Sequence, residues 1–438
     1  MFDAAVARAQ PAICLPPHFP PPPPRGRLLI LACGKSGAHM AEACEHHYLG
    51  GGLVDPERLV GICVTRHGHG RPLQRIRLVE AGHPVPDAAG LNGTADVLAL
   101  ARDAGPDDLV LVLISGGGSA NWTAPAESLD IADKQALTRK LLASGAPISD
   151  INVVRKHLSR IKGGRLAALL HPAPSLTLCI SDVPTDDPSL IASGPTAPDP
   201  TTADDAIAVL RRWRIDVPAH VEAVLAGPAG ETPKPGDPVF ADAELRIVGR
   251  PADSLAAAAK LGRAAGYEVA ELGDTLEGEA SALGAAHGAM ARDARRAGRR
   301  VLFLSGGELT VTVRGDGRGG PNQEYALALA LGVDGEPGIS ALAADTDGAD
   351  GGGGAPDDPA GAFADGTTLA RARALGLNAA AFLANNDATG FFAALGDLLI
   401  TGPTGTNVND FRCVVVDRQN RNSDKICGIG PHEPRGEG

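Results

Sequence analysis

Cysteine pairs, aromatic residues and long apolar runs are all scarce in this chain of 438 residues. Its seven cysteines are odd in number, form no CxxC pair and fall partly in apolar strand-like runs, so we expect reduced thiols in a core. No apolar stretch approaches the length of a membrane span, and the first ten residues have no signal-peptide pattern. These absences predict a cytoplasmic protein with no membrane partner.

Positive charge is also in short supply, with 40 basic against 52 acidic residues and a formal net charge of −12. Such a balance argues against a general nucleic-acid binder, because the phosphate backbone is held mainly by lysine and arginine. A small anionic substrate stays compatible with the composition, since a local pocket can be basic inside an acidic protein. The composition leaves a homo-oligomer open.

The length is too great for one ordinary core, so we expect two domains. Short runs of valine, isoleucine and leucine alternate with amphipathic or alanine-rich segments from residue 27 onward. This pattern is typical of strands buried on both faces, and it predicts an α/β fold with largely parallel sheets. A proline- and glycine-rich break at 226–243 predicts domains at 1–235 and 240–417, and we expect the tail 418–438 to be disordered.

Two glycine-rich turns follow apolar runs in the first domain and favour anion binding. The stretch ISGGGSAN offers Ser115, Gly116, Gly117, Gly118 and Ser119, whose backbone N–H groups can point outward together. The stretch LACGKSG places Lys35 after a strand, at the sheet edge where α/β proteins bind ligands. A packing turn and a solvated lysine are the alternatives, and neither stretch is a P-loop or a dinucleotide fingerprint.

Charged and polar residues gather in three further stretches. In NVVRKHLSRIKGGRLA, Arg155, Ser159 and Lys162 are predicted to share a helical face that suits a carboxylate or phosphate. Asp182, Asp186 and Asp187 follow a strand, and Asp345, Asp347 and Asp350 stand at a similar place in the second half, where carboxylates can hold Mg²⁺ or accept a proton. The loop TGPTGTNVND supplies small hydrogen-bonding side chains, including Thr406 and Asn407.

Taken together, these stretches resemble the glycerate 2-kinase family, whose C-terminal part is called the MOFRL domain. The similarity runs in order over about residues 30–416 and rests on stretches such as GHPVPDAAG, ISGGGSA, SGGELTVTV, GGPNQEYALA, TDGADG and TGPTGTNVND. The resemblance implies an N-terminal Rossmann-like α/β sandwich, a smaller C-terminal α/β domain and an active site in the cleft between them. It also implies transfer of a phosphoryl group from ATP, with Mg²⁺, to the C2 hydroxyl of D-glycerate.

Under this interpretation each candidate residue has an expected role. Lys35 and Asp182 are expected to be catalytic, Asp182 and Asp187 to bind the metal, and the turns of Ser115–Ser119 and Ser305, Gly306 and Gly307 to hold phosphates. We expect substrate contacts from the following residues: Arg155, Asn322, Glu324, Thr406 and Asn407. An NAD(P)-dependent hydroxypyruvate reductase and a non-catalytic sugar-acid or nucleotide-binding protein are the alternatives.

The chain departs from the family where an arginine usually precedes Asn-Gln-Glu, because Pro321 stands there. Proline is tolerated in the first turn of a helix, so we expect the fold to survive it. The charge of the missing arginine would have to come from elsewhere, and Arg318, three residues earlier, is expected to be a catalytic replacement.

Overall fold

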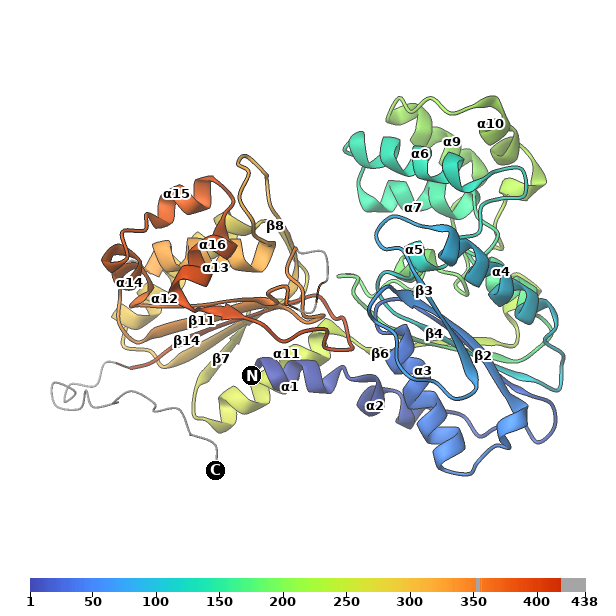
Figure 1. The fold of residues 1–438 in the computed structure, drawn as a ribbon, viewed down its shortest axis with the longest axis horizontal. Coiled ribbons are helices and arrows are strands. Elements are labelled where there is room, and N and C mark those ends of the chain that lie inside the picture. The colour runs from blue at the N-terminus through green and yellow to red at the C-terminus, as the bar shows by residue number, and fades with distance from the viewer. Residues whose placement is uncertain (334, 352–354, 356, 419–438) are drawn as a thin grey trace, which may run out of the picture.

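The computed structural model describes residues 1–333, 335–351, 355 and 357–418. These residues form two α/β domains that lie side by side (Figure 1). Of the tail 418–438, only Arg418 falls within the described residues. The expected fold class is confirmed, and each domain is built on its own six-stranded sheet.

The N-terminal domain contains six parallel strands in the order β3-β2-β1-β4-β5-β6. This is the strand order of the Rossmann fold, which changes direction between the first and fourth strands. The central strands are continuous apolar runs because both of their faces are covered. Their bounds are β1 (Leu28–Cys33), β2 (Leu59–Arg66), β3 (Ile76–Ala81), β4 (Leu109–Ile114), β5 (Ser175–Ile180) and β6 (Ala243–Gly249).

Helices cover both faces of this sheet and enclose two apolar clusters. On one face α3 (Gly37–Glu45) packs against β1, β2 and β4, and α2 (Pro11–Cys14) packs on α3. On the other face α4 (Ala88–Arg102) packs against β2 and β3 and also contacts α8 (Arg165–Leu170). The short helix α5 (Gly118–Asn121) follows β4 directly.

Four more helices of this domain form a separate layer at one end, which we call the helical cap (Figure 1). The cap consists of α6 (Ile131–Ala143), α7 (Ile148–His157), α9 (Ala203–Arg212) and α10 (Ala219–Ala226). It has its own apolar cluster, in which Leu141, Val154 and Leu210 are buried. The cap therefore has an apolar core of its own beside that of the sheet.

The C-terminal domain has a mixed sheet in the order β13-β12-β11-β14-β9-β7. Only β7 and β9 run parallel there, and the other neighbouring pairs are antiparallel. The expectation of largely parallel sheets is therefore wrong for this domain. The bounds are β7 (Glu268–Glu271), β9 (Val301–Ser305), β11 (Ile339–Asp345), β12 (Gly361–Asp365), β13 (Leu398–Leu399) and β14 (Asp410–Val416). A separate pair of parallel strands is formed by β8 (Leu276–Glu279) and β10 (Gly307–Thr310).

One face of this sheet is covered by α12 (Ala280–Arg296) and α13 (Pro321–Val333). These two helices approach closely because glycines face the contact: a Cβ on Gly284 would lie 2.3 Å from the Tyr325 carbonyl oxygen. Three short helices pack beside them, namely α14 (Thr368–Ala374), α15 (Ala379–Ala384) and α16 (Ala388–Leu395). The opposite face is covered by α11 (Pro251–Ala264).

The first helix, α1 (Phe2–Arg8), belongs to the C-terminal domain although it begins the chain (Figure 1). It packs on α11, the Phe2 ring lies 5.9 Å from the Phe411 ring, and Ser254 Oγ donates a hydrogen bond of 2.8 Å to the Ala5 carbonyl. The chain crosses to the N-terminal domain after α1 and returns after β6, which pairs with β5. The chain thus passes from the N-terminal sheet to the C-terminal domain after Gly249. This point lies later in the chain than the boundary at 235–240 that the composition suggests.

Two further observations concern features considered from the sequence. In the part of the chain that is described, no helix is long and apolar enough to cross a membrane. The six cysteines within it are buried and form no disulfide, as expected, and the seventh, Cys427, lies outside the described residues.

We expect Phe2→Ala to destabilise the C-terminal domain, because the ring is 6 % exposed and packs against Phe411. Deleting a buried aromatic side chain costs about 3 kcal/mol, which denaturant unfolding followed by circular dichroism would measure. The exposed neighbour Asp3 provides the control, since Asp3→Ala should change the free energy of unfolding by no more than about 0.5 kcal/mol. Equal stability of Phe2→Ala and wild type would contradict the docking of α1.

Candidate active site

The loops after β1 and β4 lie side by side at the carboxyl edge of the N-terminal sheet, where the strand order reverses. Ligands of open α/β sheets bind at this point. The loops are joined by hydrogen bonds, since Lys35 N donates to the Gly116 carbonyl at 2.8 Å and Ser36 N donates to Ser115 Oγ at 3.0 Å. Lys35 and the Ser115–Ser119 turn, which were singled out separately in the sequence, therefore form one site.

Glycine is required in the second of these loops for reasons of space and conformation. Gly117 has a φ of 83°, in the left-handed region that favours glycine. A Cβ on Gly116 would lie 1.8 Å from Asp182 Oδ2, so only glycine leaves room for that carboxylate. Within the described residues the amides of Gly116 and Gly117 donate no recorded hydrogen bond, which keeps them available to a ligand. Phosphate binding by this turn stays a prediction.

Lys35 reaches across to the C-terminal domain and forms an ion pair with Asp347, with 2.5 Å between Lys35 Nζ and Asp347 Oδ2. Asp347 lies in the loop that follows β11. Burial favours the neutral amine, but the carboxylates of Asp347, Asp345 and Asp182 outweigh it and raise the pKa of Lys35. Burial likewise opposes the charge of Asp347, but Lys35 lowers the pKa of that carboxyl below its usual range.

Other carboxylates surround this ion pair. Asp182 follows β5, and its Oδ2 accepts a hydrogen bond of 3.2 Å from Asn407 Nδ2 in the C-terminal domain. Burial raises the pKa of Asp182, and burial and then Asp347 raise the pKa of Asp345. Glu308 of β10 belongs to the same group, because desolvation and then Asp182 and Asp410 raise its pKa to about 7. Glu308 carried no signal in the sequence beyond its place after a glycine-rich turn.

These carboxylates are the hard oxygen donors that Mg²⁺ prefers. Among the described residues, however, no group of three histidine, cysteine or acidic side chains is arranged to hold a metal ion. Asp187 is exposed, and its carboxylate accepts a hydrogen bond of 2.8 Å from Ser189 N within a turn. The structure thus joins Asp182 to the carboxylates of the other domain and leaves Asp187 in a local turn.

The N-terminus of α13 binds a side-chain carboxylate of the same protein, that of Asp350. Asp350 Oδ1 accepts a hydrogen bond of 2.9 Å from Asn322 N, and Asp350 Oδ2 accepts one of 2.8 Å from Gln323 N. Pro321 opens the helix without an N–H, so the carboxylate uses the next two amides. Burial outweighs these amides and raises the pKa of Asp350 to about 7. Pro321 therefore fits the fold, as expected.

Three expected site residues near this helix make contacts within the C-terminal domain. Asn322 Nδ2 donates to Asp410 Oδ1 at 2.6 Å, and Glu324 Oε2 accepts a hydrogen bond of 3.0 Å from Asn386 Nδ2. Arg318 is exposed, and its guanidinium lies 3.9 Å from Asp358 Oδ1. Within the described part of the chain, Arg318 forms no hydrogen bond or ion pair with Lys35 or Asp182, so the structure does not bring this arginine to the ion pair.

The turn of Ser305, Gly306 and Gly307 is held by protein groups. Gly306 N donates to the Gly273 carbonyl at 2.9 Å, and buried Arg412 donates to the carbonyls of Gly306 and Gly307. This turn resembles that of Ser115–Ser119 in sequence but offers fewer unused donors. Thr406 also has a protein partner, because its Oγ1 donates a hydrogen bond of 2.8 Å to the Ala9 carbonyl.

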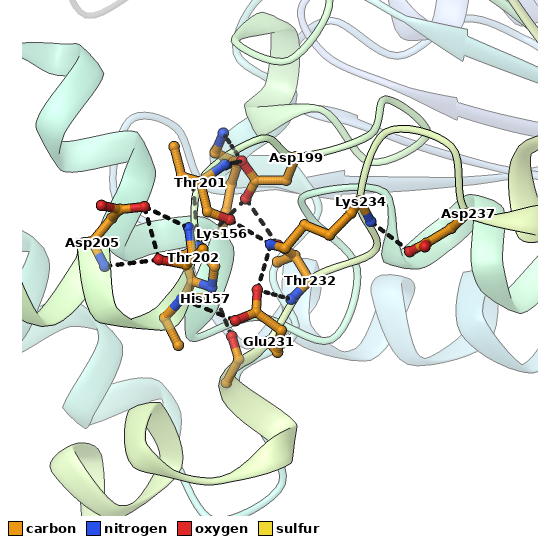
Figure 2. A network of polar contacts seen from close by, with 12 residues as sticks. Lys156, His157, Asp199, Thr201, Thr202, Asp205, Glu231, Thr232, Lys234 and Asp237 are labelled. Atoms are coloured by element: carbon orange, nitrogen blue, oxygen red, sulfur yellow. Dashed lines mark hydrogen bonds and ion pairs between the residues drawn. The ribbon is translucent and has the colours of Figure 1, made fainter.

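The basic residues of 155–165 fall into two groups: some make contacts that stabilise the fold, and others line a cavity of the site. Helix α7 ends at His157, and Figure 2 shows Lys156 and His157 turned toward the loops around Asp199 and Glu231. Lys156 Nζ donates to Asp199 Oδ1 at 2.7 Å, which outweighs the effect of burial and lowers the pKa of Asp199. Arg155 and Lys162, although not on one continuous helix, line the same cavity beside Gly117 and Ser119.

Comparison with known proteins finds matches to two family models. A domain of unknown function (DUF4147) matches residues 1–226, and the MOFRL family matches residues 301–410. A glycerate 2-kinase of Pyrococcus horikoshii is 38% identical over 403 residues, which cover 90% of this chain and 88% of that protein. The chain belongs to the DUF4147/MOFRL glycerate kinase family.

The relatives of this glycerate kinase family member carry two kinds of name. A putative hydroxypyruvate reductase of Agrobacterium vitis is 46% identical over 422 residues, which cover 95% of this chain and 93% of that protein. The crystal structure of a glycerate kinase from Thermotoga maritima has a TM-score of 0.84 and 35% identity, covering 95% of this chain and 97% of that one. Relatives under both names are therefore similar to this chain over most of its length.

We expect Gly116→Ala to disable this glycerate kinase family member without unfolding it, because the new methyl group would push Asp182 out of place. Displacing a reacting group by about 1 Å can cost about 100-fold in rate, which steady-state kinetics would measure. Gly50→Ala is a matched control, since a Cβ there meets nothing within 4 Å. Full activity of Gly116→Ala would show that the position of Asp182 does not matter.

Proposed function

We propose that this protein transfers a phosphoryl group from ATP to the C2 hydroxyl of D-glycerate, giving 2-phosphoglycerate and ADP. The observation that carries the proposal is the ion pair of Lys35 with Asp347, formed between two domains at the ligand-binding edge of a Rossmann sheet. Phosphoryl transfer depends mainly on positioning and on neutralising charge. A buried cation beside free backbone amides and several carboxylates supplies both.

The surroundings of Lys35 support a role for each neighbouring group. A bound phosphate competes with Asp347 for the ammonium group, and the amides of Gly116 and Gly117 add uncharged donors beside it. Asp182 stands next to Gly116 and has a raised pKa, so it is suited to accept the proton of the hydroxyl. Arg155 is assigned to the carboxylate of D-glycerate.

Mg²⁺ is the expected companion of ATP and would neutralise part of the phosphate charge. It usually keeps several waters and takes one or two carboxylates together with substrate phosphates. Asp345 or Asp347 from the facing loop is the ligand that we assign to it, and we no longer favour Asp187. Asp182 is the alternative ligand, in which case another carboxylate must accept the proton. We also retain a cytoplasmic location for the protein and ATP and D-glycerate as its partners.

Hydroxypyruvate reduction is the second candidate, because the relative from Agrobacterium vitis carries that name. Against it, the loop after β1 reads Gly34-Lys35-Ser36-Gly37 and lacks the glycine spacing that brings a dinucleotide pyrophosphate onto a helix start. A non-catalytic ligand-binding protein is the third candidate, and Pro321 in place of an arginine is the feature that favours it.

One coupled assay separates the three candidates. With ATP, Mg²⁺ and D-glycerate, we expect a product that enolase consumes. Lys35→Ala should lower kcat by about 100-fold or more, because removing a hydrogen-bond donor that stabilises charge in the transition state has an effect of that size. Lys140→Ala, a lysine at an exposed position, is the control and should keep wild-type kcat.

Three outcomes would contradict the proposal. NADH oxidation with hydroxypyruvate in the absence of ATP would assign the reductase instead. A product that is detected only by an assay for 3-phosphoglycerate would show that the other hydroxyl is phosphorylated. Wild-type turnover in folded Lys35→Ala would remove the lysine from the mechanism.

A further inference from the structure

A small basic cavity lies between the helical cap and the Gly-rich turn after β4. Its volume is about 140 Å³, and its polar lining includes His83, Ser119, Lys134, Arg155 and Lys162. None of the acidic residues in the described chain lines it. A cavity with three basic side chains and no carboxylate is suited to an anion, because buried charges need a partner of opposite sign.

The cavity borders the Lys35 site through one residue. Gly117 lines it, and a Cβ on Gly117 would lie 3.1 Å from the His83 ring and 3.3 Å from Lys35 Cγ. A molecule in the cavity would therefore lie close to the Lys35 side chain. The volume is well below the roughly 300–1,000 Å³ of pockets for drug-sized ligands, so it suits a small acid and excludes a nucleotide.

Lys162 is already engaged by the protein. Its Nζ donates hydrogen bonds of 2.9 Å to the Ser119 carbonyl and 3.1 Å to the Trp122 carbonyl. Lys162, in the loop between α7 and α8, thus holds two backbone carbonyls of the segment after β4. Lys162 stabilises the wall of the cavity and leaves ligand binding to the other two cations.

Lys134 and Arg155 lack such partners. Lys134 Nζ is buried without a hydrogen bond, and Arg155 has no hydrogen bond or ion pair to any described residue. Burial and then the nearby Arg155 lower the pKa of Lys134 to about 8. Two unpaired cations held next to each other in a buried place are unfavourable when the cavity is empty. A bound anion would offset both the desolvation of the two charges and their mutual repulsion.

We propose that Lys134 of α6 and Arg155 of α7 together bind the carboxylate of a small hydroxy acid in this cavity. The identity of that acid as D-glycerate rests on the proposed function. Lys134 is then a substrate-binding residue that the sequence did not reveal. The helical cap, which carries both cations, is the element that recognises the substrate.

The test is equilibrium binding of D-glycerate without ATP, measured by calorimetry on wild type, Lys134→Met and Lys140→Met. A charge-assisted hydrogen bond is worth about 1.5–3 kcal/mol, so the Kd of Lys134→Met should rise about ten- to hundredfold. Lys140 is in the same helix at an exposed position, and its replacement should leave the Kd unchanged. Glycerol, which has no carboxylate, should bind neither wild type nor variant.

Two further readouts exclude a merely structural role. Lys134→Met removes an unpaired buried charge, so the ligand-free variant should melt at a temperature at least as high as wild type. In turnover, the KM for D-glycerate should rise in Lys134→Met. The KM for ATP should change less than about twofold, because the substitution removes no contact with ATP.

The outcomes separate this inference from the proposed function. Binding of D-glycerate that depends on Lys134, in a protein that forms no phosphorylated product, would support the inference and refute the kinase. Turnover by wild type with an unchanged Kd in Lys134→Met would keep the kinase and overturn the inference. No binding of D-glycerate by folded wild type would also overturn it.

Discussion

The ion pair between Lys35 and Asp347 is the contact on which the candidate active site depends. It joins residues 312 positions apart, one after the first strand of the N-terminal sheet and one after β11 of the C-terminal sheet. Burial opposes both charges, and each partner stabilises the charged form of the other. The domains must therefore meet at this edge for the site to exist. The second contact across the same boundary, from Asn407 to Asp182, supports that placement.

The path of the chain holds the two domains in this arrangement. Helix α1 packs on α11 of the C-terminal domain before the chain enters the N-terminal sheet, so two segments cross between the domains. Thr406, in the loop that also carries Asn407, is hydrogen-bonded to the carbonyl of Ala9 just after α1. The start of the chain thus supports a loop of the site although it contributes no reacting group.

Most of the strands and both loops of the N-terminal site could be predicted from the sequence, because buried parallel strands are continuous apolar runs and glycines mark the turns after them. β12 is not evident from the sequence, since GAFAD is a short run of mostly small residues. The docking of α1 and the pairing of Lys35 with Asp347 could not be predicted, because both depend on how two separately folded sheets face each other. Glu308 was missed for the same reason, and Lys134 was missed because its approach to Arg155 depends on how the helices of the cap pack.

The start of α13 shows how a local pattern can mislead. A glycine-rich turn before a helix suggests an anion site, and the anion there is the carboxylate of Asp350. The similar Ser-Gly-Gly turns after β4 and β9 also differ, since the second uses Gly306 N within the protein while the first leaves two amides without a recorded partner. The distinction lies in the partners of each N–H group, which sequence does not show.

The most direct test of this account is a double-mutant cycle between the domains, with kcat/KM measured for Lys35→Met, Asp347→Asn and the double variant. If the two side chains act as one unit, each single variant should lose about as much activity as the double variant, because residues of one unit are strongly non-additive. Losses that simply multiply in the double variant would show that Lys35 and Asp347 act independently, and would contradict an active site built on their contact.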